Sequence, residues 1–214
     1  MKFLVVLSLI FFFALGSSAQ DGTGVSVESW YMSFSLGTGS LSMGGDYEGM
    51  TDGYDADHPP LYFDFTGYYT VTPQLLLGAG GSFYVANYTR ANDAAQGQQL
   101  YSIMLHADVK YFMDQITRGF FAEAAFIYGN LGEINVIDEG SGNTGTVIGK
   151  SGPGIRLGVG WAIENNPGES AFLLGLNWTY LATDDEAEIP VGMSTTTLEV
   201  SGSASMINFY IGIL

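Results

Sequence analysis

Three residues in one stretch of the chain have side chains that could act together as nucleophile, base and acid. Ser102, His106 and Asp108 fall in the same phase of the alternating segment 99–112, so a strand would place them on one face. Such a set could support acyl transfer. Residues four apart on a strand lie about 13 Å apart along it, so Ser102 cannot donate a hydrogen bond to His106. We therefore assign no catalytic residues.

Ionisable residues recur in the phase opposite to the large apolar residues. Charged side chains cannot face lipid, so this phase is expected to point into a packed interior, where the side chains form a polar network. Arg156 stays charged at physiological pH and needs a carboxylate. Glu123 is the expected partner, with Asp64 and Asp108 as second choices. The predicted network consists of Asp64, His106, Asp108, Lys110, Glu123 and Arg156.

A second cluster of acids could hold a metal ion. Asp52, Asp55 and Asp57 offer oxygen ligands of the kind that Ca²⁺ and Mg²⁺ prefer, but their spacing is not that of an EF-hand loop. The segment is rich in Gly and charge, which favours a solvated loop. None of the Gly runs opens a helix, so no phosphate-binding loop is expected. We predict no metal and no cofactor.

The stretch 154–180 gives the clearest evidence for the strands that would position these residues. Large apolar residues alternate there with Gly, Ala, Asn, Thr and the occasional charge, on both sides of a turn at 165–168. In a soluble sheet the solvent face would carry many charges. Small residues on one face and large apolar ones on the other indicate instead a hairpin of a transmembrane β-barrel.

The same alternation predicts eight strands. Two lie in 154–180, and the others are 25–36, 61–71, 75–88, 99–112, 120–130 and 197–214. The connections alternate in length: 37–60, 89–98, 131–152 and 183–196 are predicted as long loops, and 72–74, 113–118 and 165–169 as short turns. Short periplasmic turns and long extracellular loops are typical of outer-membrane barrels.

The first 19 residues have the pattern of a secretory signal peptide. Lys2 precedes an apolar run from Phe3 to Leu15 and a small-residue cleavage site that ends at Ala19. The run is shorter than the roughly 20 residues that a membrane helix needs. The remaining residues, 20–214, fit one barrel domain, and the signal predicts export through the Sec pathway.

Composition narrows the range of partners. The chain has 22 acidic and 6 basic residues, for a formal net charge of −16, and no Cys. Such acidity repels nucleic acid, so no RNA or DNA partner is expected. Without Cys there is no disulfide framework and no thiolate metal site.

Aromatic residues occur near both ends of the predicted strands, where the two membrane interfaces would lie. Strand propensity alone explains their presence but not this placement. The predicted girdles contain Tyr101, Tyr128, Trp178 and Tyr180 toward the long loops, and Tyr69, Tyr111, Phe120 and Trp161 toward the short turns.

Together these features resemble the small eight-stranded outer-membrane proteins of Gram-negative bacteria, of the OmpA and OmpX type. Members often end in an aromatic residue, whereas this chain ends in Phe209-Tyr210-Ile211-Gly212-Ile213-Leu214. The resemblance implies an all-β, eight-stranded antiparallel up-and-down transmembrane β-barrel in the bacterial outer membrane. It also implies a monomer that contacts lipopolysaccharide and the barrel-assembly machinery.

We expect a structural or surface-interaction role, in which acidic extracellular loops meet an unknown ligand and the interior is filled. The alternatives are a narrow channel for small solutes and a lipid-modifying enzyme, such as a lipid A deacylase or acyltransferase. A secreted soluble barrel is a further rival, although it gives no reason for the alternation of loop lengths.

Overall fold

The computed structural model describes residues 29–45, 54–56, 59–90, 93–131, 133–138, 143–148, 151–166, 170–191 and 194–214. Their strands are β1 (Trp30–Gly45), β2 (Tyr54–Ala56), β3 (Leu61–Thr72), β4 (Leu75–Arg90), β5 (Asp93–Phe112), β6 (Gly119–Asn130), β7 (Glu133–Asp138), β8 (Asn143–Ile148), β9 (Gly152–Asn166), β10 (Ser170–Val191) and β11 (Ser194–Ile213). No helix in this part of the chain is long and apolar enough to cross a membrane.

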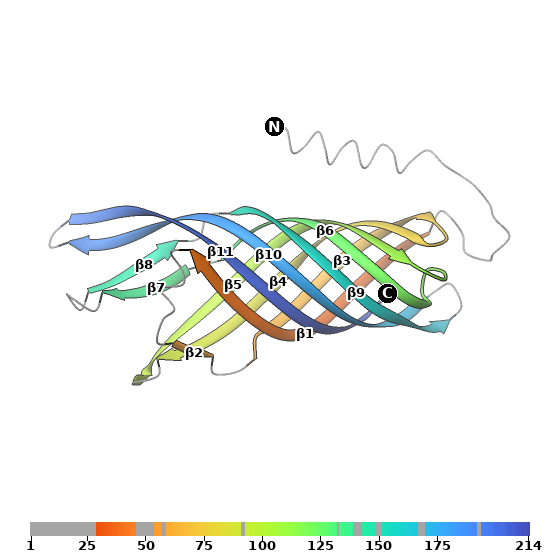
Figure 1. The fold of residues 1–214 in the computed structure, drawn as a ribbon, viewed down its shortest axis with the longest axis horizontal. Coiled ribbons are helices and arrows are strands. Elements are labelled where there is room, and N and C mark those ends of the chain that lie inside the picture. Colours follow the sequence, from red (N-terminus) through yellow and green to blue (C-terminus); the bar gives the residue numbers. More distant parts are fainter. Residues whose placement is uncertain are drawn as a thin grey trace, which may run out of the picture.

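Eight of these strands form a closed antiparallel barrel. The wall runs β1, β3, β4, β5, β6, β9, β10, β11, and the pairing of β11 with β1 closes it (Figure 1). Trp30 on β1 lies opposite a residue of β3, which in turn lies opposite a residue of β4, and so on around the wall. Followed once around the barrel, this row of paired residues returns to β1 at Ser40, ten residues further along. This stagger makes the strands tilt against the barrel axis, as closure requires. The predicted fold class is confirmed.

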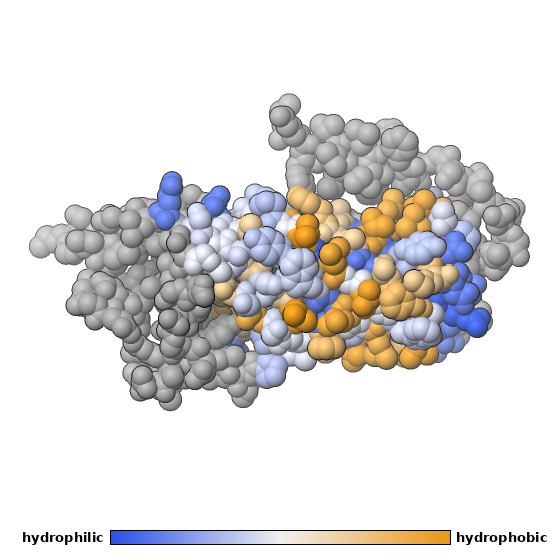
Figure 2. Space-filling model, viewed as in Figure 1, coloured by the Kyte–Doolittle hydropathy of each residue, from blue (hydrophilic) through white to orange (hydrophobic). Residues whose placement is uncertain are grey.

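Where the structure describes the side chains of the wall strands, these alternate between lumen and outer surface. On β6, for example, Phe121, Glu123 and Ile127 are buried while Phe126 and Tyr128 are exposed. The exposed apolar residues gather in a band toward the end of the barrel that carries the short turns, with hydrophilic residues beyond it at that end (Figure 2). An apolar belt outside and charged residues inside is the arrangement expected of a membrane barrel.

Much of the sequence predicted to form long loops is strand. β1 continues to Gly45, β4 and β5 extend over most of 89–98, and β10 and β11 pair as far as Val191 and Ser194. Within 131–152 the chain forms the β7–β8 hairpin, whose second strand pairs with β10. Ladder hydrogen bonds join backbone groups and do not need alternating apolar side chains, so the strands continue where the apolar pattern stops.

The short turn 113–118 folds against the end of the barrel. Ile116 is fully buried, and its N–H donates to the carbonyl of Pro73 in the neighbouring turn at 2.8 Å. Thr117 has a positive φ of 78°, and its hydroxyl donates to Glu164 Oε1 at 3.2 Å. The turn thus adds an apolar side chain to the lumen at this end.

Candidate functional site

The centre of the lumen is the guanidinium of Arg156 on β9. The neighbouring residues Ile155 and Leu157 face outward, so Arg156 must point inward, where it is 2% exposed. Its Nη1 donates to Asp64 Oδ2 at 2.8 Å and its Nη2 to Asp108 Oδ2 at 3.0 Å. One cation thus joins carboxylates from β3 and β5, and both ion pairs are buried.

Hydroxyl groups donate to the three carboxylates of the lumen, Asp64, Asp108 and Glu123. Thr66 donates to Asp64 Oδ1 at 2.8 Å, and Ser82 donates to Asp64 Oδ2 at 2.9 Å. Further hydroxyl contacts come from three tyrosines: Tyr62 to Asp64 at 3.1 Å, Tyr68 to Asp108 at 3.1 Å and Tyr210 to Glu123 at 3.2 Å. Buried charges are tolerated when they are paired and hydrogen-bonded in this way.

His106 joins the same cluster from β5. Its Nδ1 lies 3.3 Å from Arg156 Nη2, and its Nε2 lies 3.0 Å from Asp64 Oδ2. Arginine can only donate, so Nδ1 accepts in this contact, whereas Nε2 lies at ion-pair distance from the carboxylate without forming a hydrogen bond to it. His106 therefore bridges the cation and the acid of the central ion pair.

A second ion pair lies next to the first along β5 and β6. Lys110 Nζ is 3.2 Å from Glu123 Oε2, and both side chains are almost fully buried. The ammonium also lies over the rings of Tyr68 and Phe121, at 5.1 and 4.9 Å from their centroids. Aromatic faces stabilise a cation that has lost its water.

The expected pairing of Arg156 with Glu123 is wrong. On the neighbouring strands Arg156 lies opposite Ala125, whereas Glu123 lies opposite Gly158 and, on the other side, Lys110. Glu123 is thus taken by the cation directly across from it. Ala125 is small, and the long arginine side chain extends over it to Asp108, which lies opposite Ala125 on the next strand.

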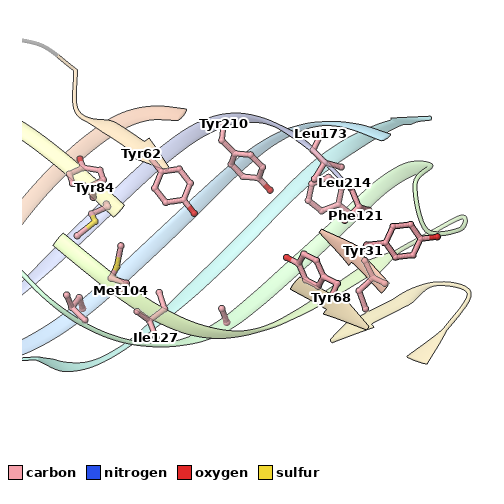
Figure 3. Packing of buried hydrophobic residues seen from close by; sticks show 14 of the residues in the cluster. Tyr31, Tyr62, Tyr68, Tyr84, Met104, Phe121, Ile127, Leu173, Tyr210 and Leu214 are labelled. Atoms are coloured by element: carbon pink, nitrogen blue, oxygen red, sulfur yellow. The ribbon is translucent and has the colours of Figure 1, made fainter. Parts of the chain in front are cut away.

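Apolar layers lie on both sides of the charged residues. Along β5 the inward residues run Phe112, Lys110, Asp108, His106 and Met104, so the charged residues fall between a ring and a thioether. The layer near the short turns consists of Leu76, Phe112, Ile116, Phe121, Leu173 and Leu214, and the layer toward the other end of Tyr84, Met104, Ile127, Leu131 and Leu181. Figure 3 shows several of these side chains pointing into the lumen from different strands.

Neither Ser102 nor Ser82 is paired with His106 in this arrangement. Ser102 donates to the carbonyl of Asn130 at 2.6 Å, and Ser82 is engaged by Asp64 and Arg156. The described contacts of His106 are with Arg156 and Asp64, not with a serine. A Ser-His pair of the kind that acyl transfer needs is therefore not formed by these residues.

All six residues predicted for the network lie buried in the lumen. Sequence reasoning missed Tyr62, Ser82 and Tyr210. The sequence could have identified them, because each alternates with outward apolar residues in its strand. A polar side chain that points into the lumen needs a hydrogen-bond partner there.

The residues of the predicted girdles lie on the outer surface. Tyr111, Tyr128, Trp161, Trp178 and Tyr180 are exposed, and Tyr69, Tyr101 and Phe120 are partly exposed. Trp30, not predicted as a member, is exposed on the same surface beside Tyr69, with ring centroids 5.3 Å apart.

Two groups of predicted residues fall wholly or partly outside the described structure. The signal segment 1–19 lies there, as do Asp52 and Asp57. Asp55 belongs to β2, of which only the backbone is described. Among the described residues, no three His, Cys, Asp or Glu side chains are grouped as a metal site requires.

No model of a known protein family and no curated protein matches the chain. Among solved structures it is similar to the outer membrane protein OprG from Pseudomonas aeruginosa, with a TM-score of 0.50 and 12% identity over 90% of this chain and 99% of that one. The outer membrane protein AlkL, determined in lipid bilayers, gives a TM-score of 0.49 and 11% identity over 93% and 96%. Ail, the attachment invasion locus protein of Yersinia pestis, gives 0.47 and 15% over 86% and 99%. The chain has the fold of the small outer-membrane β-barrels.

Proposed function

We propose that this chain is a bacterial outer-membrane protein whose lumen is closed and whose role is structural or one of surface interaction. The observation that carries this proposal is the Arg156 network between its two apolar layers. An eight-stranded barrel has an interior just wide enough for its own side chains. Here the described side chains are joined across the lumen by ion pairs, and we expect them to leave no polar path of the kind that a porin provides.

The membrane location rests on the outer face. Residues such as Met32, Leu105 and Phe209 are more than half exposed, and they belong to a continuous belt around the wall. Monomeric soluble proteins rarely expose a patch of this extent. A hydrocarbon environment removes the cost of that exposure, so the belt supports a bilayer and disfavours a secreted soluble barrel.

The surface role rests on the strands that extend past the belt. The far part of β10 carries Asp184, Asp185, Glu186 and Glu188, paired with β11 in a long hairpin. β7 and β8 lie beside this hairpin at the same end of the barrel (Figure 1). With the short turns in the periplasm, this acidic end faces outside the cell and is available to an extracellular partner.

Planar-bilayer recording tests the closed lumen. The purified, refolded wild-type protein is expected to give no steady conductance steps, after its insertion has been verified by a gel shift between unheated and boiled samples. Large, steady openings would overturn the closed-barrel proposal and favour a narrow channel.

Single-cysteine labelling tests the orientation, since the chain has no native Cys to interfere. Asp184→Cys places a thiol at the acidic end, and Asn165→Cys places one near the short turn between β9 and β10; both positions are exposed. A membrane-impermeant maleimide added to intact cells is expected to label the first variant only. Labelling of the second alone would invert the proposed orientation and remove the surface role.

A further inference from the structure

The strand β11 extends past the barrel wall with one edge that no described strand covers. Its residues 194–201 pair with β10, whereas β1 pairs with β11 only from Gly202 onward. β1 ends at Gly45, which has a positive φ of 72°. Figure 1 shows the β10–β11 hairpin continuing beyond this end of β1. Among the described strands, none lies beside residues 194–200 on the side away from β10.

An edge of this kind offers backbone groups to another chain. In an antiparallel ladder every second residue directs its N–H and C=O to the same side, so about half of residues 194–200 direct theirs away from β10. Proteins often blunt such edges with Pro, Lys or a bulge, because an extended segment can add to them. Residues 194–200, STTTLEV, contain neither Pro nor Lys, and their register with β10 runs without a shift. The edge is therefore competent for strand addition.

The charges next to the edge select a basic partner. Glu199 is exposed on β11 and lies directly opposite Glu186 on β10. Like charges directly opposite each other on neighbouring strands are destabilising. A basic residue on an added strand, opposite Glu199, would lie about 5 Å from it. It would lie about two strand spacings, or 10 Å, from Glu186, where salt screens the attraction only partly. Such a cation would offset the repulsion between the two glutamates.

The charge pattern continues on either side of Glu199. Alternate residues of a strand share a face, and the register with β10 places several acids on the face of Glu199. These acids are Asp184, Glu186 and Glu188. The opposite face of β11 carries Leu198 and Val200 instead. A strand that alternates basic and apolar residues would therefore match both faces of this edge.

Two other occupants fit this edge less well. The segment of the chain that follows β1 carries Asp46, Glu48 and Asp52, and a second copy would bring its own acidic hairpin. Either would place further negative charge beside Glu199, which is unfavourable. The formal net charge of −16 also attracts a basic partner at longer range.

We propose that the edge of β11 at residues 194–200 binds an extended segment of a partner protein that carries Lys or Arg at alternate positions. The backbone ladder supplies contacts that are independent of sequence, and the acids select the charge pattern of the added strand. This inference rests on the proposed function, because it names the partner chemistry of the acidic end that is proposed to face outside the cell.

Synthetic peptides test the proposal on the refolded protein in nanodiscs of zwitterionic phosphatidylcholine, with empty nanodiscs as the blank. The probe is a seven-residue peptide of alternating lysine and valine with both ends blocked. A glutamate–valine peptide reverses its charge, and a lysine–proline peptide keeps the charge but cannot complete a ladder, because proline has no N–H. Calorimetry is expected to detect binding of the probe and at least about tenfold weaker binding of both controls. Equal binding of the lysine–proline peptide would show attraction by charge alone and overturn the proposal.

A matched pair of variants locates the site. Glu199→Lys and Asp114→Lys change the net charge equally, and both positions are exposed, Asp114 in the short turn at the other end of the barrel. Glu199→Lys also removes a repulsion with Glu186, so we expect it to fold at least as well as the wild type. It is expected to weaken binding of the lysine–valine peptide about tenfold, whereas Asp114→Lys should leave it unchanged. Equal losses, or no loss in either variant, would contradict the proposal.

Hydrogen exchange on the same samples shows whether the peptide lies on the edge. The lysine–valine peptide is expected to slow exchange of amides within 194–200 and to leave those of the turn 113–118 unchanged. Slow exchange of all amides in 194–200 before the peptide is added would mean that the chain's own segment or a second copy covers the edge, and would overturn the proposal.

The labelling of intact cells tests the surface role separately from the edge. Binding in nanodiscs together with an inverted orientation in cells would support the edge and remove the surface role. No binding in nanodiscs, together with labelling of Asp184→Cys in cells, would overturn the edge and keep the surface role.

Discussion

Neighbouring residues on β9 meet opposite environments. Ile155 and Leu157 are 45% and 50% exposed on the outer wall, while Arg156 between them is 2% exposed in the lumen. In a soluble protein the order is the reverse, because apolar side chains are buried and charged ones are almost never fully buried unless they are paired. The outer and inner faces of this wall therefore follow two different rules.

The difference shows what stabilises each face. The outer face needs no specific partner, since any hydrocarbon satisfies it. The inner face depends on particular atoms: Arg156 is balanced by Asp64 and Asp108, and Lys110 by Glu123. A single substitution is expected to be most harmful where partners are specific, less harmful where only polarity counts, and least harmful where only volume counts.

Arg156→Ala is expected to have the largest effect. It leaves Asp64 and Asp108 buried without their cation, and removing one partner of a buried ion pair costs about 3 to 5 kcal/mol. Urea unfolding in lipid vesicles, followed by tryptophan fluorescence, measures this loss. Adding Asp64→Asn and Asp108→Asn to the same protein is expected to recover part of it, because the orphaned charges are then removed.

The control is an ion pair outside the lumen. Arg118 lies 3.3 Å from Asp114 in the short turn, and its side chain is 61% exposed. Exposed pairs contribute about 0 to 1 kcal/mol, so Arg118→Ala should hardly change the free energy of unfolding. If both arginines could be removed at similar cost, the contrast between lumen and surface would be wrong.

An arginine placed on the outer face is expected to have the next largest effect. Leu176 lies in the apolar belt beside Val159 and Phe209. Leu176→Arg should lower the free energy of unfolding in bilayers by about 2 to 4 kcal/mol if the position is near the midplane. Asn165→Arg, close to the short-turn end of β9, should cost about 0 to 1 kcal/mol, because charges near the interface are tolerated. Equal costs at the two positions would mean that the belt does not contact hydrocarbon.

The wall of the barrel could be predicted from the sequence because each strand carries its own evidence. In 61–71 and 120–130 large apolar residues alternate with polar or small ones, and both segments are strands in the structure. Beyond the belt this contrast ends. The extension of β1 to Gly45 consists largely of Gly and Ser, and only Leu41 and Met43 continue its apolar alternation. The far part of β10 is acidic. In both places the apolar pattern is too short to indicate a strand.

The network was predictable in membership but not in pairing. The alternation within each strand indicated that Arg156, Asp64 and Asp108 all point into the lumen. Which carboxylate meets the guanidinium depends on register and on the reach of the side chain across the lumen. Sequence order indicates that β6 and β9 are neighbours, but the register that sets Arg156 opposite Ala125 instead of Glu123 is fixed only by the folded ladder.

The smallest of the three effects tests volume alone, with the same substitution on each face. A Cβ on Gly175 would enter the ring of Tyr210 in the lumen, whereas a Cβ on Gly67, on the outer side of β3, would meet nothing closer than the carbonyl oxygen of Ala79 at 4.0 Å. Gly175→Ala is therefore expected to cost about 1 to 3 kcal/mol through overpacking. Gly67→Ala should be neutral or stabilise by about 0.5 kcal/mol, since glycine in a strand is entropically unfavourable.

Tyr210→Ala provides the second arm of a double-mutant cycle, because it removes the ring that a new methyl group would strike. If the cost arises from that contact, Gly175→Ala should be milder in the Tyr210→Ala protein than in the wild type, and the difference gives the coupling energy. A cost that is the same in both backgrounds would locate the defect in the backbone of β10. The packed lumen would then not be what distinguishes Gly175 from Gly67.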